Sequence, residues 1–210
     1  MKKGTLISVI VVLGLVAGGV FLLRGDRNSV PPETDREVDT EQIEVTHNQT
    51  ESMNTLQIAS TAFEANGLIS EKYTCDGENV RPEFTFTGIP NGTVSLAFIM
   101  DDPDIPENVK KSRSIDVFVH WVVFDIPPGN AGISAPRSLP GIEGANSAGE
   151  NGYIGPCPPD REHRYFFKLY ALDAILGLSP GASKIDVERA MEGHVIAQTE
   201  LVGRYNRKGR

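Results

Sequence analysis

The sequence reads Val117-Phe118-Val119-His120-Trp121-Val122-Val123-Phe124 near the middle of the chain, and this segment carries the clearest fold signal. It is dominated by branched and aromatic side chains, which favour β-strands. Alternating apolar and polar residues would indicate a strand with one solvent-exposed face. This nearly continuous apolar run instead predicts a central strand covered on both faces. His120 needs a separate explanation, because a buried imidazole requires a hydrogen-bond partner.

Short β-rich runs lie on both sides of this strand and are separated by turn residues. The predicted strands are residues 56–60, 84–87, 94–100, 117–126 and 165–172. Pro90-Asn91-Gly92-Thr93 predicts a tight turn between two of them. One helix is predicted after Pro180-Gly181, with Ser183 and Asp186 at its start. Its shared face is expected to hold Val187, Ala190, Met191, His194 and Val195. We therefore expect a mainly β fold, an antiparallel sandwich with a helix on its outside.

The N-terminus carries an apolar segment. Residues 4–23 are uncharged, and at about 1.5 Å per helical residue these 20 positions would extend roughly 30 Å, the thickness of a bilayer core. Lys2 and Lys3 precede the segment, which is longer than the apolar core of a signal peptide. We predict a single-pass transmembrane anchor over residues 1–23, with the N-terminus in the cytoplasm and the domain outside. Cleavage near Val16-Ala17-Gly18-Gly19 would instead give a secreted protein.

Residues 24–54 are predicted to be a disordered linker. They hold 8 acidic and 3 basic side chains and few apolar ones, a composition typical of a solvated tether. The folded domain is then residues 55–210. The formal net charge of the chain is -8, which argues against nucleic-acid binding, because that function needs clustered Lys and Arg.

Polar residues gather at the ends of two predicted strands. Asp101-Asp102-Pro103-Asp104-Ile105-Pro106 directly follows the strand at 94–100, so carboxylates lie where a strand enters a loop stiffened by two prolines. His163-Arg164-Tyr165 leads into the strand at 165–172 and adds a second imidazole and a phenol. A carboxylate beside His120 would fix the tautomer of the ring and favour its protonated form. A plainer interpretation is also open: carboxylates that cap a turn and a satisfied core histidine.

A glycine- and proline-rich loop, Gly152-Tyr153-Ile154-Gly155-Pro156-Cys157-Pro158-Pro159, is expected to be rigid and able to approach a ligand closely. The amides of Gly155 and Cys157 are then candidate donors to an oxyanion, and a purely structural loop is the alternative. With a metal, Asp102, Asp104, His120 and His163 could supply nitrogen and oxygen ligands. Without one they would form an anion site. We predict neither a metal nor a cofactor.

Cys75 and Cys157 are the only cysteines. An extracytoplasmic domain would permit them to form a disulfide, whereas a free thiol that lines the site is the alternative. The sequence leaves both open.

Five motifs occur in a specific order along the chain. They are Tyr73-Thr74-Cys75-Asp76-Gly77, Asp102-Pro103-Asp104-Ile105-Pro106, Phe118-Val119-His120-Trp121, Gly152-Tyr153-Ile154-Gly155-Pro156-Cys157-Pro158-Pro159 and His163-Arg164-Tyr165. With these motifs, residues 56–207 resemble the phosphatidylethanolamine-binding protein family in its bacterial and archaeal, Raf-kinase-inhibitor-like branch. The resemblance implies a two-sheet antiparallel sandwich with peripheral helices and a small surface pocket for phosphate, phosphoryl head groups, acetate or similar anions. Pocket positions of the family fall on Asp102, His120, His163 and Tyr165, with Pro106 on a wall and Cys157 where other branches have glycine.

The leading hypothesis is a non-catalytic module that binds an anion or a phosphoryl head group. In this hypothesis His120 and His163 donate to the anion, Asp102 orients and charges an imidazole, and Tyr165 lines the pocket. The predicted ligand-binding residues are Asp102, Asp104, Pro106, His120, Gly155, Cys157, His163 and Tyr165. One alternative is an inhibitor of a protease or kinase that acts through the same surface. Another is a metal-dependent or acid/base hydrolase, although the sequence has no H-E-x-x-H motif and no serine with an evident base to supply its chemistry.

Overall fold

Two antiparallel sheets form most of the fold in a computed structural model that describes residues 55–130, 132–134 and 139–207. The small sheet has the order β1-β2-β5 and contains β1 (Gln57–Ser60), β2 (Phe84–Thr87) and β5 (Gly132–Ile133). The large sheet has the order β6-β4-β3-β7-β8 and contains β3 (Ser95–Asp102), β4 (Phe118–Ile126), β6 (Ile142–Glu143), β7 (His163–Leu172) and β8 (Val195–Tyr205). The helical elements are the 3₁₀ turn η1 (Glu71–Tyr73), α1 (Glu107–Arg113) and α2 (Lys184–Met191). The prediction of two antiparallel sheets with peripheral helices is confirmed.

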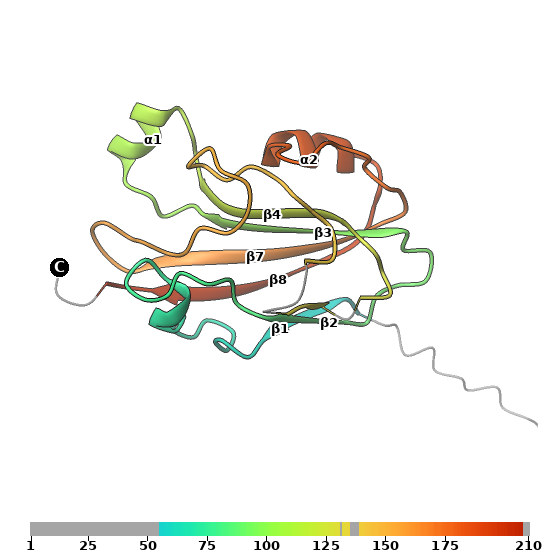
Figure 1. The fold of residues 1–210 in the computed structure, drawn as a ribbon, viewed down its shortest axis with the longest axis horizontal. Coiled ribbons are helices and arrows are strands. Elements are labelled where there is room, and N and C mark those ends of the chain that lie inside the picture. Colours follow the sequence, from blue (N-terminus) through green and yellow to red (C-terminus); the bar gives the residue numbers. More distant parts are fainter. Residues whose placement is uncertain (1–54, 131, 135–138, 208–210) are drawn as a thin grey trace, which may run out of the picture. The chain divides into compact units, whose positions relative to one another are not determined.

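The main hydrophobic core lies between the two sheets. The ring of Phe84 on β2 packs against Phe98 of β3 and Phe167 of β7, with centroid distances of 5.0 and 5.1 Å. Trp121 of β4 meets Phe98 edge-on at 5.2 Å. Tilted and edge-on arrangements of this kind are the favourable geometries for aromatic pairs. In Figure 1, β1 and β2 lie below the large sheet and the two helices lie above it.

A second apolar layer covers the opposite face of the large sheet. Val122 and Phe124 of β4 form one cluster there with Val187 and Met191 of α2. Because Trp121 and Val123 point into the core between the sheets, β4 is buried on both faces, as its continuous apolar sequence predicts. It pairs with β3 and β6, and β3 occupies the middle of the sheet.

Helix α2 starts as its sequence predicts but ends earlier. The Ser183 side chain accepts a hydrogen bond from the Asp186 amide, and the Asp186 carboxylate accepts one from the Ser183 amide, which together form a capping box. The expected apolar face ran on to Val195, whereas the helix stops at Met191 and Val195 begins β8. Gly193, with a φ of +79°, lets the chain reverse at this point.

Several elements gave too weak a pattern to be predicted. Strand β8 pairs with β7 along its whole length but exposes much of its first half, so it lacks an apolar signature. Helix α1 buries none of its residues, and a helix without an apolar stripe shows no periodicity. The predicted turn at Pro90-Asn91-Gly92-Thr93 is present, with the Thr93 amide 3.3 Å from the Pro90 carbonyl oxygen, but it carries the chain from the small sheet to the large one.

None of the helices within the described residues is long and apolar enough to cross a membrane. The predicted anchor at residues 1–23 and the predicted linker at residues 24–54 lie outside those residues.

Candidate functional site

A cavity of about 250 Å³ lies where β3 ends and β4 and β7 begin. Strand β3 is antiparallel to both neighbours, so its last residue, Asp102, lies at the same end of the sheet as the first residues of those strands. Asp102 is paired with Phe118 in the register of β3 and β4. The cavity is lined by Asp102, Ile105, Pro106, Val109, Arg113, Phe118, His120, Ile154, Gly155, Cys157, Pro158, Pro159 and His163.

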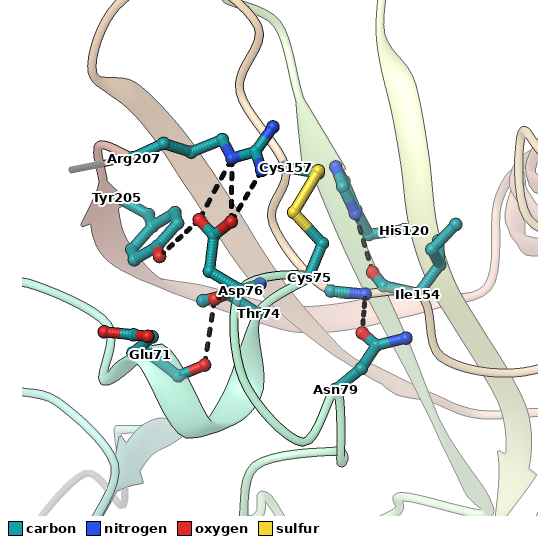
Figure 2. Close-up of a disulfide and its surroundings, with 11 residues drawn as sticks. Glu71, Thr74, Cys75, Asp76, Asn79, His120, Ile154, Cys157, Tyr205 and Arg207 are labelled. Atoms are coloured by element: carbon teal, nitrogen blue, oxygen red, sulfur yellow. Dashed lines mark hydrogen bonds and ion pairs between the residues drawn. A yellow bond between two sulfur atoms is a disulfide. The ribbon is translucent and has the colours of Figure 1, made fainter. Parts of the chain in front are cut away.

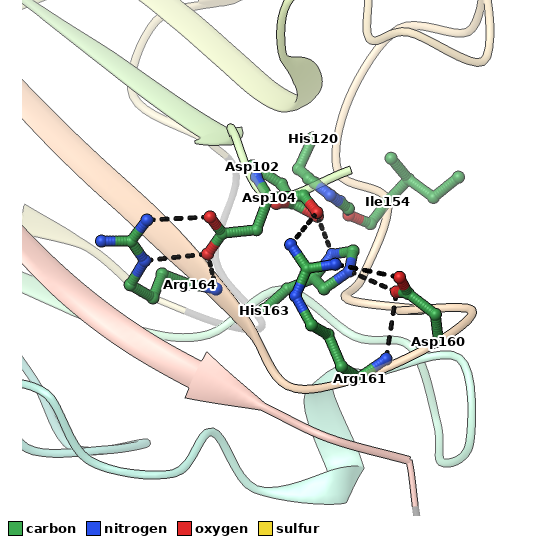
Figure 3. A network of polar contacts seen from close by, with 8 residues as sticks. All are labelled: Asp102, Asp104, His120, Ile154, Asp160, Arg161, His163 and Arg164. Atoms are coloured by element: carbon green, nitrogen blue, oxygen red, sulfur yellow. Dashed lines mark hydrogen bonds and ion pairs between the residues drawn. The ribbon is translucent and has the colours of Figure 1, made fainter. Parts of the chain in front are cut away.

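His163 lies between two carboxylates, as Figure 3 shows. Its Nδ1 atom is 2.7 Å from Oδ2 of Asp102, and its Nε2 atom is 2.9 Å from Oδ1 of Asp160. Burial lowers the pKa of His163, but the hydrogen bonds and the attraction of both carboxylates outweigh burial, so the pKa is raised. The ring can satisfy both carboxylates only as an imidazolium, which carries a proton on each nitrogen.

His120 has a different partner from the predicted one. Its Nδ1 atom is 2.7 Å from the Ile154 carbonyl oxygen, and the Ile154 amide donates to the His120 carbonyl oxygen at 3.0 Å. Burial is the main cause that lowers the pKa of His120, although the carboxylates of Asp102 and Asp101 oppose it. The carboxylate of Asp102 therefore charges His163, whereas His120 is held by a loop carbonyl and favours its neutral form.

The loop at residues 152–159, called the cavity loop below, is fixed to the segment around Cys75 (Figure 2). A disulfide joins Cys75 to Cys157, with their Cα atoms 5.4 Å apart, so the pairing left open by the sequence is present and the free-thiol alternative is excluded. The Gly155 amide donates to Oδ1 of Asn79 at 2.8 Å, and a Cβ atom at Gly155 would lie 2.6 Å from the Tyr73 carbonyl oxygen. Gly155 is thus required for close packing, and its amide is already used within the protein.

Two predicted site residues do not line the cavity. The Asp104 carboxylate binds the Arg164 guanidinium through two contacts of 2.8 Å, and this hydrogen bonding lowers the pKa of Asp104 to about 2. Tyr165 is fully buried, with its ring 5.2 Å from that of His120. In the described part of the chain, its hydroxyl is the one buried side-chain polar atom without a hydrogen-bond partner. The cavity therefore brings together Asp102, Pro106, His120, Gly155, Cys157 and His163 from the predicted set.

Arg113 lines the cavity and was not predicted. It is the last residue of α1, its guanidinium donates to the Ser147 carbonyl oxygen at 3.2 Å, and it lies 5.9 Å from the centre of the Phe118 ring. Within the described residues no carboxylate forms an ion pair with it. The run of basic residues after Pro106 was the available signal, because cations are favoured in the last turn of a helix.

The residues considered as metal ligands are not gathered around one point. Asp104 is committed to Arg164, and both nitrogens of His163 face carboxylates. Within the described ranges, no group of three or more His, Cys, Asp or Glu side chains is arranged to hold a metal ion.

Known proteins are similar to this chain over most of its length. A UPF0098 protein of Methanothermobacter thermautotrophicus is 47% identical over 158 residues, which cover 72% of this chain and 99% of the relative. A UPF0098 protein of Chlamydia muridarum is 40% identical over 150 residues, which cover 71% and 98% of the two chains.

Solved structures are similar as well. The crystal structure of a putative phosphatidylethanolamine-binding protein homolog from Chlamydia trachomatis has a TM-score of 0.69 and 37% identity, and the match covers 74% of this chain and 99% of that one. The structure of E. coli YbcL, described as a new member of the mammalian PEBP family, has a TM-score of 0.64 and 26% identity, with 73% and 99% covered.

The family model described as phosphatidylethanolamine-binding protein matches residues 59–206, which is well over half of the chain. Together with relatives that align over nearly their whole length, this match shows that the chain belongs to the phosphatidylethanolamine-binding protein family and is of its bacterial and archaeal type.

Proposed function

We propose that the cavity binds a small oxyanion, such as phosphate or the phosphoryl group of a head group, and that the domain is a binding module. The observation that carries this proposal is Arg113, a cation on the cavity wall that forms no ion pair with a carboxylate among the described residues. A guanidinium presents its N–H groups as a planar fork that matches two oxygens of an oxyanion. The positive charge of Arg113 therefore differs from that of His163, because the charge of His163 is already balanced by Asp102 and Asp160.

The size and stiffness of the cavity support a small ligand. Pro106, Pro158 and Pro159 line it, and proline rings restrict the backbone on which they sit. A volume of about 250 Å³ suits a head group better than an acyl chain. The family description, phosphatidylethanolamine-binding protein, points to the same phosphoryl chemistry.

Binding without catalysis fits the chemistry of the wall. The residues around the cavity include no serine or threonine, and Cys157 is in a disulfide, so none of them offers a hydroxyl or thiol nucleophile. The imidazole of His163 is fixed by two carboxylates, which leaves it no free nitrogen to act as a general base.

Titration calorimetry with inorganic phosphate and with phosphoethanolamine tests this proposal. Replacing Arg113 by Gln removes the charge, and loss of one charge-assisted hydrogen bond of about 1.5–3 kcal/mol should weaken binding roughly tenfold or more. Arg189→Gln is the matched control, because Arg189 is an exposed cation on α2 that pairs with Asp186. Equal affinities in all three proteins, or no binding by the unmodified protein, would refute the proposal.

We also propose that the domain works in an oxidising compartment outside the cytoplasm. Both cysteines of the Cys75–Cys157 disulfide are exposed, so cytoplasmic reductants would reach them. Alkylation of the protein in freshly broken cells tests this location. Labelling only after reduction agrees with the proposal, whereas labelling of both thiols before reduction contradicts it.

A further inference from the structure

The protonation of His120 is set by the atom that its Nδ1 contacts. A carbonyl oxygen has no proton to give, so the 2.7 Å contact with Ile154 requires the proton to be on Nδ1. A second proton on Nε2 would charge a ring that is only 4% exposed and is flanked by Phe118 and Tyr165, with centroid distances of 4.9 and 5.2 Å. Nε2 therefore carries a lone pair to which none of the described residues donates, and it is not one of the fully buried atoms.

The charged groups near His120 do not change this assignment. Asp101 and Asp102 favour a protonated ring and His163 disfavours it, but burial is the largest influence and the pKa of His120 is lowered. The neutral ring with Nδ1–H therefore presents a hydrogen-bond acceptor, and His120 is one of the residues that line the cavity.

Asp102 adds a second acceptor to the same wall. It is 3% exposed, and each of its oxygens accepts one hydrogen bond: Oδ1 from the Asp104 amide at 2.8 Å and Oδ2 from His163 at 2.7 Å. Each carboxylate oxygen can accept more than one bond and donates none. An oxyanion oxygen without a proton would face lone pairs on both side chains, whereas a ligand O–H or N–H would satisfy them.

We propose that this cavity selects oxyanions that bring their own hydrogen-bond donor, such as hydrogen phosphate, and rejects fully deprotonated tetrahedral anions such as sulfate. The proposal rests on the proposed function and specifies its ligand: the negative charge is met by Arg113 and the donor by His120 or Asp102. Phosphoethanolamine meets the same requirement, because its ammonium group carries N–H donors beside the phosphoryl charge. A site built to bond a donor discriminates strongly against an analogue that lacks it, because buried polar groups are then left unpaired.

A comparison of four inorganic anions separates the effect of the ligand's proton from the effects of its size and charge. At slightly alkaline pH, phosphate and arsenate are chiefly dianions that retain one O–H, whereas sulfate and selenate are dianions with none. Calorimetry with the full-length protein should find phosphate and arsenate bound at least about tenfold more tightly than sulfate and selenate, as one lost buried hydrogen bond implies. Equal affinities for all four would overturn the selectivity and leave anion binding intact, and failure of all four to bind would refute both.

Substitutions at two histidines test whether His120 is the source of the preference for phosphate over sulfate. Gln in place of His120 carries both a carbonyl and an amide group, so it can accept from one anion and donate to another, and the phosphate-to-sulfate ratio should fall toward one. His194→Gln is the control, because His194 is an exposed histidine bound to Asp173, and it should keep the ratio of the unmodified protein. An unchanged ratio in folded His120→Gln would overturn the assignment to His120. If that variant does not fold, the four-anion comparison on the unmodified protein still decides the selectivity.

Discussion

The Nδ1 atom of His163 lies 2.7 Å from Oδ2 of Asp102, although the two residues are 61 positions apart in the chain. Both side chains are buried, and a buried charge needs a partner of opposite sign or a hydrogen bond. The pair sets the charge at the end of the large sheet, and Asp160 completes it on the opposite side of the ring. The cavity thus has one charged and one neutral imidazole.

The two imidazoles should titrate on opposite sides of the usual histidine pKa of 6.5. NMR titration of the ring protons is expected to place His163 above this value and His120 below it. Because the folded pKa of His163 is raised, its stabilising effect is complete below about pH 6.5 and is lost as the pH rises through the folded pKa. The free energy of unfolding should therefore fall more on the alkaline side in the unmodified protein than in His163→Gln. Coincident titration of both rings would contradict the assignment.

Removing the carboxylate of Asp160 should strengthen anion binding. Asp160→Asn takes away one negative charge beside the cavity and leaves Nε2–H of His163 without its charged acceptor. The side chain is 41% exposed, so the gain should be modest, about twofold to fivefold, as for an exposed ion pair worth under about 1 kcal/mol. Asp173→Asn breaks the corresponding Asp–His pair with His194 and should leave the affinity for phosphate unchanged. Weaker binding by Asp160→Asn would show that Asp160 contributes to the site in another way.

The ion pair of Asp104 and Arg164 should contribute to acid stability. The pKa of Asp104 is lowered from 3.8 to about 2, so its stabilisation is present above about pH 3.8 and is lost as the pH falls toward 2. Denaturant unfolding across this interval should show a smaller loss of stability in Asp104→Asn than in the unmodified protein. Asp116→Asn, which removes an exposed carboxyl group elsewhere, should keep the full loss. Identical acid profiles for Asp104→Asn and the unmodified protein would argue against this role.

The disulfide should stabilise the whole domain. Cys75 and Cys157 are 82 positions apart in the chain, and a cross-link of this span restricts the unfolded chain. The double variant Cys75→Ser, Cys157→Ser should lose about 2–4 kcal/mol of unfolding free energy in guanidinium titrations. Reductant should lower the stability of the unmodified protein by a similar amount and leave the double variant unaffected. An unmodified protein insensitive to reductant would contradict this prediction.

Gly155 should not tolerate a side chain. The Cβ atom of alanine would lie 2.6 Å from the Tyr73 carbonyl oxygen and 2.5 Å from Oδ1 of Asn79, so the cavity loop would have to move. Gly155→Ala should lose about 1–3 kcal/mol of stability, as for overpacked sites, and should weaken phosphate binding. The control is Gly129→Ala, because a Cβ atom there meets no atom within 4 Å. Equal stability of the two variants would show that the loop can relax without cost.

The strands and the capped helix could be predicted because their signals are local. A continuous apolar run identified β4, and Ser183 with Asp186 marked the start of α2, since strand burial and helix capping depend on residues close in sequence. The ordered motifs were enough to identify the family, and six of the eight predicted site residues line the cavity. Helix α1, and with it Arg113, left no such pattern because the helix buries none of its side chains.

Tertiary structure alone decided which groups meet. Asp101 and Asp102 are neighbours, yet Asp102 contacts His163 whereas the Asp101 carboxylate lies 2.7 Å from Lys184 and 3.1 Å from Lys168. Successive residues of β3 point to opposite faces, so Asp102 continues the face of Phe98 and Met100, whereas Asp101 continues the face of Ile99. From the sequence, carboxylates and imidazoles could be predicted to lie at one end of the sheet. Strand register and loop packing decided which imidazole is charged, because the charge depends on contacts between residues far apart in the chain.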